Sequence, residues 1–224
     1  MIAHNTPPAL ARAIVRALPI RPGQSVLEAH VGTGAFPTAL AEVYPGHRLR
    51  VEVGDLNPDN SGLRLAPDVT QRFGSFRAYP GMDFLASNPW RPADLVIGNP
   101  PYGDETSRDE AEPHIRRALE VVRPGGSVVF VLQNGFTFGM GRYERVWKPG
   151  SGIPRPFHIW NIVGRPSFNV TGGPVPTGER NGSTNKYEYV AIWWNTAVPD
   201  PRTTVDWMFD PDTYGTGRRA WGGP

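Results

Sequence analysis

Short apolar runs alternate with amphipathic stretches along the first 135 residues of the chain. The runs have the length and the β-branched content of buried strands, and they lie at residues 25–29, 48–54, 76–79, 93–98 and 127–132. Stretches with helical spacing lie among them, at residues 9–18, 35–44, 63–76 and 111–122. This alternation predicts an α/β protein with a doubly wound, mostly parallel sheet, because strand–helix–strand units place successive strands parallel. Thr6 is the expected N-cap of the first helix, and Pro124-Gly125 is expected to end the last one.

The pattern loosens after residue 136. Two strand-like runs at residues 158–163 and 186–194 are separated by a loop rich in glycine, proline and threonine, so we expect an antiparallel hairpin at one sheet edge. This makes a seven-stranded, Rossmann-like sheet. The expected catalytic domain is residues 1–195, followed by an irregular tail at 196–224 that is rich in proline and glycine.

Composition narrows the class of protein. The chain has 224 residues, enough for one α/β domain, and it has no cysteine for disulfides, thiolate chemistry or zinc ribbons. No window has 18 uncharged apolar residues and no signal peptide is apparent, so we expect a cytoplasmic protein of a bacterium or a phage-infected host, away from membranes. Most basic residues are arginine, which is compatible with contact to phosphate groups; a coding genome rich in G and C, which favours arginine codons, is the alternative explanation.

Acidic residues and glycines follow successive predicted strands. Residues 28–34 read Glu-Ala-His-Val-Gly-Thr-Gly, where Gly32 and Gly34 permit close approach of a ligand. The third glycine of a dinucleotide fingerprint is missing, and Glu28 suits an ammonium group better than a pyrophosphate. Asp55 ends the next strand at a distance typical of a ribose-binding carboxylate. Asp83 and Phe84 are expected at an adenine amine and ring. Together these side chains predict a site for S-adenosylmethionine.

Residues 99–102, Asn-Pro-Pro-Tyr, follow the predicted strand at 93–98. The side-chain oxygen of Asn99 and the carbonyl of Pro100 can accept both hydrogens of an exocyclic amine, while Pro101 stiffens the turn and Tyr102 stacks on the ring. Two acceptors favour a pyramidal nitrogen and stabilise the positive charge that develops on it. No metal or general base is required. A base in a duplex must be flipped out to reach such a socket.

The chain resembles the amino-methyltransferases that act on DNA adenine. The resemblance covers about residues 5–195 and is carried by four segments of the sequence, namely Thr6-Pro7-Pro8, residues 26–36, Asp83-Phe84-Leu85 and the Asn-Pro-Pro-Tyr motif. Their order is similar to the gamma arrangement of that family, and residues 165–168 and 187–189 are similar to late motifs of compact phage and bacterial members. Ala29 and His30 depart from the family, which usually has proline at position 29.

The resemblance implies a DNA adenine-N6 methyltransferase and a role for each matching residue. For the donor, S-adenosylmethionine, it implies Thr6, Glu28, Gly32, Gly34, Asp55, Asp83 and Phe84. For the target amine and base it implies Asn99, Pro100, Pro101, Tyr102 and, on the opposite face of the base, Phe168. Core packing remains an alternative for Phe84 and Phe168.

Other functions remain open at this point. Cytosine-N4 enzymes usually have serine at the position of Asn99, so adenine is favoured. Protein-glutamine N5 methyltransferases share Asn-Pro-Pro-Tyr but have a helical domain ahead of the donor loop. An RNA adenine-N6 enzyme, an inactive S-adenosylmethionine-binding module and a phosphate-binding Rossmann protein are further alternatives. Sequence recognition is expected from loops at 142–155 and 171–183, or from a partner protein.

Overall fold

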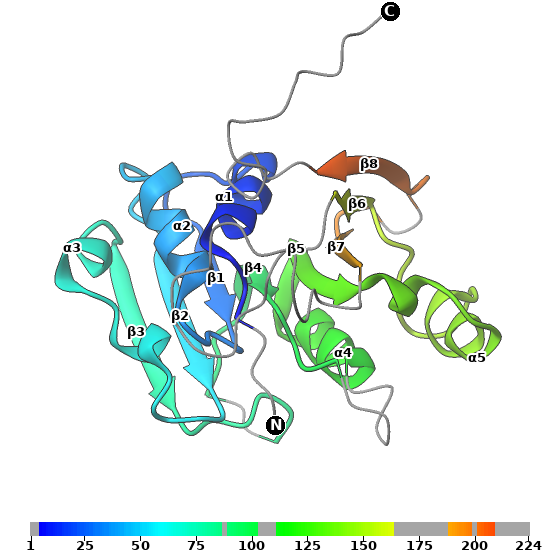
Figure 1. Cartoon of the computed structure of the whole chain (residues 1–224), viewed down its shortest axis with the longest axis horizontal. Helices are drawn as coiled ribbons and strands as arrows, with labels where there is room; N and C mark the ends of the chain where they lie inside the picture. The colour runs from blue at the N-terminus through cyan, green and yellow to red at the C-terminus, as the bar shows by residue number, and fades with distance from the viewer. Residues whose placement is uncertain (1–4, 87–88, 103–110, 164–187, 199–200, 209–224) are drawn as a thin grey trace, which may run out of the picture.

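The structure is a computed structural model that describes residues 5–86, 89–102, 111–163, 188–198 and 201–208 (Figure 1). Several expectations fall outside these residues, namely Phe168, the late motif at 165–168, Tyr187 and the loop at 171–183. The helices and strands are, in chain order, α1 (Pro8–Ala17), β1 (Ser25–Glu28), α2 (Ala35–Val43), β2 (Arg50–Asp55), η1 (Ser61–Arg64), α3 (Pro67–Thr70), β3 (Ser75–Pro80), β4 (Ala93–Gly98), α4 (Ala111–Val121), β5 (Val122–Gln133), η2 (Asn134–Thr137), α5 (Met140–Arg142), η3 (Tyr143–Trp147), β6 (His158–Ile162), β7 (Tyr189–Asn195) and β8 (Thr204–Met208).

Within the described residues the strands form one eight-stranded sheet in the order β3-β2-β1-β4-β5-β7-β6-β8. The strands β1 to β5 pair in parallel, whereas β7 is antiparallel to both β5 and β6. The predicted α/β class, the mostly parallel sheet and the antiparallel pair are confirmed. The predicted number of seven strands is wrong, because Thr204–Met208 forms the strand β8, which pairs in parallel with β6 at the sheet edge. The expectation of an irregular tail is therefore wrong for these five residues.

Helices cover both faces of the sheet (Figure 1). Along β5, Val129 and Val131 belong to the core under α1 and α2, whereas Val128 and Phe130 belong to the core under α4. Because successive side chains of a strand point to opposite faces, a strand that is covered on both sides is apolar at every position. The continuous apolar runs in the sequence reflect this double burial.

Three local predictions are wrong. The N-cap of α1 is Pro7 and no side-chain hydrogen bond caps the helix, so Thr6 does not have that role. Pro8 at the first helical position has no amide hydrogen, which removes one of the donors that a cap would satisfy. Residues 63–76 do not form one helix, because Pro67 interrupts the pattern and starts the short α3. The helix expected at residues 111–122 ends at Val121 as predicted, but the strand expected at 127–132 begins already at Val122, so Pro124-Gly125 lies inside β5, beside an irregularity in the pairing with β4.

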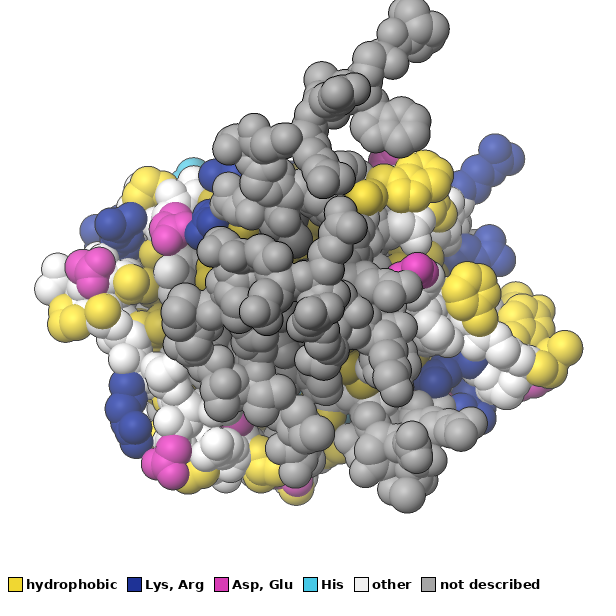
Figure 2. Space-filling model, viewed as in Figure 1, with side chains coloured by type: hydrophobic (Ala, Val, Ile, Leu, Met, Phe, Trp, Pro, Cys, Tyr) yellow, Lys and Arg dark blue, Asp and Glu magenta, His cyan; other side chains and the backbone are white. Residues whose placement is uncertain are grey.

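In the described part of the chain, no helix has both the length and the hydrophobicity needed to cross a lipid bilayer. The surface does carry exposed hydrophobic side chains, and some of them gather at the end of the molecule that carries α5 (Figure 2). This end also carries basic side chains, drawn in dark blue in the same view.

Candidate active site

The ends of β1, β2 and β4 lie next to one another at the carboxyl edge of the sheet. Strand β1 pairs in parallel with β2 on one side and with β4 on the other. The last residue of β1 is Glu28, the last residue of β2 is Asp55, and Asn99 directly follows β4. Open α/β sheets bind ligands at this edge, so the fold brings these polar side chains to a ligand-binding position.

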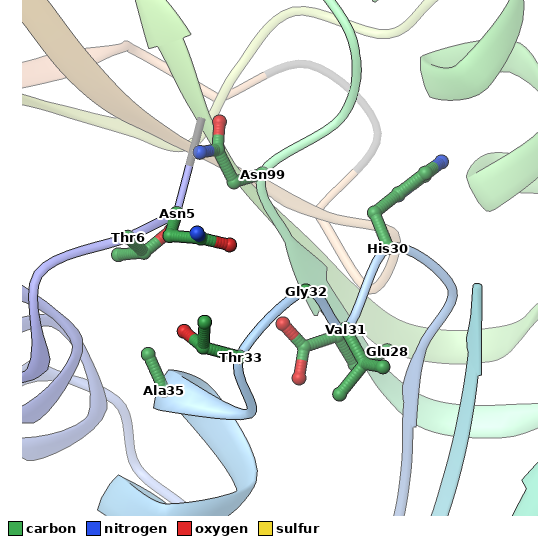
Figure 3. Close-up of a pocket in the computed structure, with 9 residues that line it drawn as sticks. All are labelled: Asn5, Thr6, Glu28, His30, Val31, Gly32, Thr33, Ala35 and Asn99. Carbon is green, nitrogen blue, oxygen red and sulfur yellow. The ribbon is translucent and has the colours of Figure 1, made fainter. Parts of the chain in front are cut away.

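A cavity of about 20 Å³ lies at this edge of the sheet (Figure 3). Its wall is formed by Asn5, Thr6, Glu28, His30, Val31, Gly32, Thr33, Ala35 and Asn99. Four residues predicted from the sequence are thus brought together, namely Thr6, Glu28, Gly32 and Asn99. A cavity of this volume encloses about one water-sized group; it accommodates an ammonium group, and the bulk of a nucleoside would extend beyond it.

The donor loop after β1 depends on glycine at two positions. Gly32 and Gly34 have φ angles of +50° and +84°, a region that side chains disfavour. A Cβ atom at Gly34 would lie 2.6 Å from Leu65 and 3.0 Å from the Cα of Gly62. The amide of Gly62 also donates to the carbonyl of Gly32 at 2.9 Å. The segment after β2 therefore packs directly on the donor loop, a contact that the sequence did not indicate.

Glu28 is the buried carboxyl group of the site. Its exposed fraction is 3%, and Figure 3 shows its carboxylate turned into the cavity beside Thr33. Among the described residues, the oxygen Oε2 has no hydrogen-bond partner. Burial raises the pKa of this carboxyl well above its ordinary value of 4.5, and the charge of Asp55 raises it further. A buried carboxylate oxygen with no donor fits a cationic group, which would lower this pKa again.

The two aspartates that were expected at the ribose and the adenine lie at the same edge but do not line the cavity. Asp55 accepts hydrogen bonds from the amides of Gly32 and Asn57, both at 2.9 Å, so it holds the donor loop against β2. Asp83 accepts from the amide of Leu85 at 2.8 Å, as in a local turn. Carboxylate oxygens have further lone pairs, and both groups can still accept from a ligand.

Phe84 lies in the hydrophobic core, with an exposed fraction of 2%. Its ring centroid is 5.4 Å from that of His30 and 6.1 Å from that of Trp90. The structure thus gives Phe84 the core-packing role that was the alternative reading of the sequence. Contact with a bound adenine stays a prediction.

Asn99 and Tyr102 are hydrogen-bonded to each other. The hydroxyl of Tyr102 donates to Oδ1 of Asn99, the oxygen that was expected to accept from a target amine. The ring of Tyr102 packs against Tyr189, with 5.8 Å between centroids. Burial raises the pKa of the Tyr102 phenol well above 10.0, and Tyr189 contributes to this shift. Pro100 is buried and Pro101 is half-buried, which fixes the turn that carries Asn99.

His30 joins the donor loop to α4. Its Nε2 lies 2.8 Å from Nδ1 of His114, and Figure 3 shows its side chain pointing away from Glu28. Burial lowers the pKa of His30 well below 6.5, and the neighbouring imidazole of His114 lowers it further. His30 is therefore neutral at pH 7, and which of the two rings donates depends on the tautomer. Sequence reasoning flagged His30 only as a departure from the family, because its partner is distant in the chain.

Comparison with known proteins gives weak sequence similarity. No protein-family model matches the chain. The chain is 26% identical over 108 residues to the release factor glutamine methyltransferase of Koribacter versatilis (strain Ellin345). This match covers 48% of the chain and only 37% of that enzyme.

Similarity of structure is far more extensive. A Listeria monocytogenes protein assigned to the class I S-adenosylmethionine-dependent methyltransferases has a TM-score of 0.63 at 15% identity, covering 93% of this chain and 67% of its own. The methyltransferase subunit of a type I restriction-modification system from Streptococcus thermophilus has a TM-score of 0.62 at 14% identity, covering 91% of this chain and 47% of its own. TrmN from Thermus thermophilus has a TM-score of 0.53 at 21% identity, and the match covers 84% of this chain and 48% of TrmN. The chain therefore has the fold of the S-adenosylmethionine-dependent methyltransferases, and the cofactor predicted from the sequence is the one that accompanies this fold.

Proposed function

We propose that the chain transfers the methyl group of S-adenosylmethionine to the N6 amine of adenine in DNA. The observation that carries the proposal is that Glu28 and Asn99 line one cavity. A buried carboxylate suits the cationic end of the donor, and the amide of Asn99 suits the amine of the acceptor. Enzymes that join two reactants gain much of their rate by holding both in one place.

The donor side of the site is formed by the loop after β1. Glu28 would hold the ammonium group of the methionine moiety, since its Oε2 is buried and has no partner among the described residues. Gly32 and Gly34 let the backbone approach the donor closely. Asp55 would accept from the ribose hydroxyls and Asp83 from the adenine amine, with Phe84 beneath the ring. When bound, S-adenosylmethionine supplies an electrophilic methyl group.

The acceptor side is formed by the turn after β4. Oδ1 of Asn99 and the carbonyl of Pro100 would accept the two amine hydrogens, which directs the nitrogen lone pair out of the ring system and stabilises positive charge on nitrogen. After methylation the nitrogen loses one proton to solvent. Tyr102 would stack on the base once its hydroxyl leaves Asn99, with Phe168 as the proposed opposite face. The base must be flipped out of a duplex to enter.

DNA is proposed as the substrate for two reasons. The resemblance of the Asn-Pro-Pro-Tyr segment and the donor loop is to enzymes that methylate DNA adenine. Among the structures that share the fold, the Streptococcus thermophilus protein and a Vibrio vulnificus YJ016 protein are described as methyltransferase or modification subunits of type I restriction systems. Recognition of a target sequence would come from loops at 142–155 and 171–183, or from a partner protein.

Transfer to a protein glutamine is the second candidate. It is favoured by the match to a release factor glutamine methyltransferase over 108 residues. A glutamine amide also presents an NH2 group with a delocalised lone pair, so Asn99 and Pro100 could grip it in the same way. An RNA adenine would fit the socket equally well.

A competition assay separates these substrates. The protein is incubated with methyl-labelled S-adenosylmethionine and equal amounts of duplex DNA, RNA of the same sequence and a bacterial release factor. Label in DNA, found as N6-methyladenine after digestion to nucleosides, supports the proposal. Label only in the release factor or only in RNA contradicts it.

A further inference from the structure

The segment between β5 and β6 exposes several large hydrophobic side chains. Phe138, Met140 and Tyr143 have exposed fractions of 67%, 76% and 46%. They surround an open hollow of about 470 Å³, which we call the α5 hollow. It is lined by Thr137, Phe138, Gly139, Met140, Tyr143 and Trp147. This volume is in the range of sites that take a small planar molecule.

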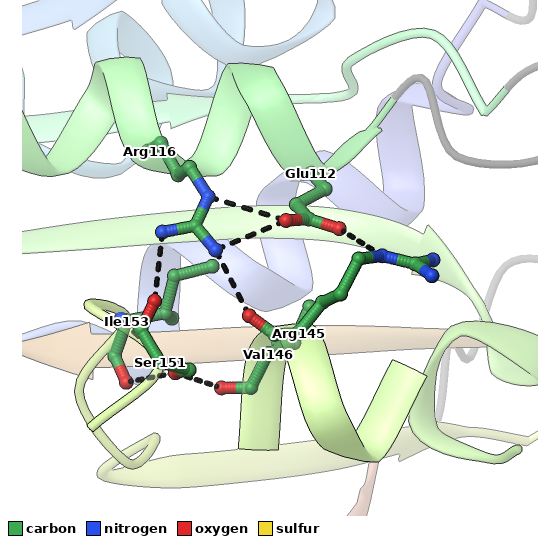
Figure 4. A network of polar contacts seen from close by, with 6 residues as sticks. All are labelled: Glu112, Arg116, Arg145, Val146, Ser151 and Ile153. Atoms are coloured by element: carbon green, nitrogen blue, oxygen red, sulfur yellow. Dashed lines mark hydrogen bonds and ion pairs between the residues drawn. The ribbon is translucent and has the colours of Figure 1, made fainter. Parts of the chain in front are cut away.

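A polar network ties the segment that carries the hollow to α4 (Figure 4). Glu112 of α4 accepts from Nη2 of Arg116 and from Nε of Arg145, each at 3.0 Å. Arg116 in turn donates to the backbone carbonyls of Arg145 at 2.9 Å and Ser151 at 3.0 Å. Glu112 is largely buried, since its side chain is 12% exposed. The exposed side chains therefore stand on a scaffold tied to α4, so their arrangement is preorganised for a ligand.

Trp147, which lines the hollow, packs on a buried aromatic ring. Trp147 packs edge-on against Phe136, with 5.7 Å between ring centroids. The guanidinium of Arg142 lies 4.1 Å from the centroid of Phe136 on its face, a cation–π arrangement. Val146 on the same turn is 1% exposed and anchors it to the core. Flat rings next to guanidinium groups are typical of surfaces that stack nucleobases.

Positive charge is concentrated in the same segment. Residues 134–157 contain Arg142, Arg145, Lys148 and Arg155 against a single acid, Glu144, a net charge of +3. The whole chain has a net charge of +2, so the remainder of the chain is −1. Glu112 and Arg116 of the neighbouring α4 carry opposite charges, so counting them with this segment leaves its net charge at +3. An anionic partner is favoured at this surface, and a protein partner would have to be acidic to match it.

The hollow follows the carboxyl end of β5, at the same edge of the sheet as the site proposed for methyl transfer. Strands β4 and β5 are parallel neighbours, with Gly98 in register with Phe130. Asn99 directly follows β4, and the segment of the hollow directly follows β5 at Gln133. Figure 1 shows α5 projecting beyond the end of β5, beside α4. A strand that delivers a base to Asn99 would therefore have its neighbouring nucleotides within reach of this surface.

We propose that the α5 hollow stacks an unpaired base of the nucleic acid near the target base, with its backbone phosphates held by the basic residues of 142–155. This inference rests on the proposed function, which it deepens by naming a second contact with the substrate strand. It assigns to Phe138 and Tyr143 the role of stacking surfaces that position the strand.

Binding of a fluorescein-labelled, adenine-containing single-stranded DNA, measured by anisotropy without S-adenosylmethionine, tests the inference. The double variant Phe138→Ala/Tyr143→Ala is expected to raise Kd by about tenfold, since stacking of one base contributes about that factor. Met140→Glu, which adds a negative charge at the rim, is expected to raise it as well. Trp207→Ala is the matched control, because Trp207 is an aromatic residue exposed at 70% on β8, and it should leave Kd within twofold.

The outcomes separate this inference from the proposed function. Kd values for the double variant and Met140→Glu that equal the wild-type value overturn the inference, even if adenine is methylated. So does a loss of self-association, seen by light scattering, with unchanged affinity for DNA. If the wild-type protein fails to methylate adenine yet binds DNA through Phe138 and Tyr143, the proposed function is wrong and the inference stands.

Discussion

The hydroxyl of Tyr102 donates a hydrogen bond to Oδ1 of Asn99, within the turn that follows β4. The same oxygen is the proposed acceptor for the target amine. The resting structure therefore gives this oxygen an internal donor, and a base that binds there would compete with the hydroxyl of Tyr102 for it. The ring of Tyr102 currently packs on Tyr189, so a movement of Tyr102 away from Asn99 would also bring the ring out to stack on the base.

Replacement of Tyr102 separates its hydroxyl from its ring. Tyr102→Phe keeps the ring and removes the competing donor, whose net contribution is about 1 kcal/mol. We expect kcat/KM for DNA to stay at the wild-type level or rise up to about fivefold. Tyr102→Ala removes the stacking surface and should lower kcat/KM by about tenfold or more. Steady-state kinetics with labelled donor measure both values; equal losses in the two variants would contradict this account.

Binding of the donor should strengthen with rising pH because of Glu28. Burial raises the pKa of this carboxyl above 4.5, whereas an ammonium group binds its ionised form. Affinity should therefore increase as pH rises through the elevated pKa. Without donor, stability should change in the opposite direction, because the folded state holds the proton more tightly than the unfolded state, and stability is lost as pH rises from about 4.5 through the folded pKa.

Glu28→Gln is the matched variant for this pH dependence. It should weaken donor binding by about tenfold or more at pH 8, since a charged hydrogen bond contributes about 1.5–3 kcal/mol. It should also remove the pH dependence of donor affinity and the pH dependence of stability that Glu28 causes. Titration calorimetry with S-adenosylmethionine and thermal unfolding, each from pH 5 to 9, measure these effects. A pH-dependent affinity that persists in the variant would assign the titration to another group.

Gly62 should be required for the shape of the donor loop. A Cβ atom at Gly62 would lie 2.5 Å from the amide nitrogen of Gly34, so Gly62→Ala must displace the loop. We expect a loss of about 1–3 kcal/mol of stability and weaker donor binding. Gly46→Ala is the control, because a Cβ atom there meets no atom within 4 Å. Similar unfolding temperatures and donor affinities in the two variants would contradict the packing described above.

Asp94 should stabilise the fold above acidic pH. It accepts from the amide and the hydroxyl of Ser25, both at 2.7 Å. These bonds and the charges of Arg123 and Arg50 lower its pKa, although burial alone would raise it. Asp94→Asn should cost about 1–3 kcal/mol at pH 7. The difference should disappear as pH falls below 3.8, because stability from a depressed pKa is lost on protonation.

Asp59→Asn is the control for Asp94. Its partner Arg64 is 3.8 Å away and both side chains are more than half exposed, so this pair contributes little. Chemical denaturation of the three proteins at pH 7 gives the comparison. An equal stability of Asp94→Asn and the wild-type protein at pH 7 would show that the bonds to Ser25 are not stabilising.

Much of the fold could be predicted from local patterns. The apolar runs predicted β1 to β5 because strands covered on both faces are apolar throughout. Since parallel strands end at one edge, the sequence also predicted that Glu28 and Asn99 would lie near each other. Strand β8 could not be predicted, because Thr204–Met208 lies in a segment rich in proline and is a strand through its pairing with β6.

The unexpected parts of the site are contacts between distant segments. His30 and His114 are 84 positions apart, and no local pattern joins them. Gly62 contacts the donor loop at Gly34, which lies 28 positions earlier in the chain. The bond between Tyr102 and Asn99 is local, yet it depends on the packing of the ring against Tyr189. Each of these contacts follows from tertiary packing, which residue spacing does not encode.

The most direct test is mass spectrometry of nucleosides from duplex DNA incubated with S-adenosylmethionine and either the wild-type protein or Asn99→Ala. The account predicts N6-methyladenine with the wild-type protein and at least about a hundredfold less with Asn99→Ala, because the main acceptor for the amine is lost. The affinity of Asn99→Ala for S-adenosylmethionine should remain within a factor of two. N6-methyladenine at equal levels with both proteins, or its absence from the DNA with methyl groups found only in protein or RNA, would contradict the account.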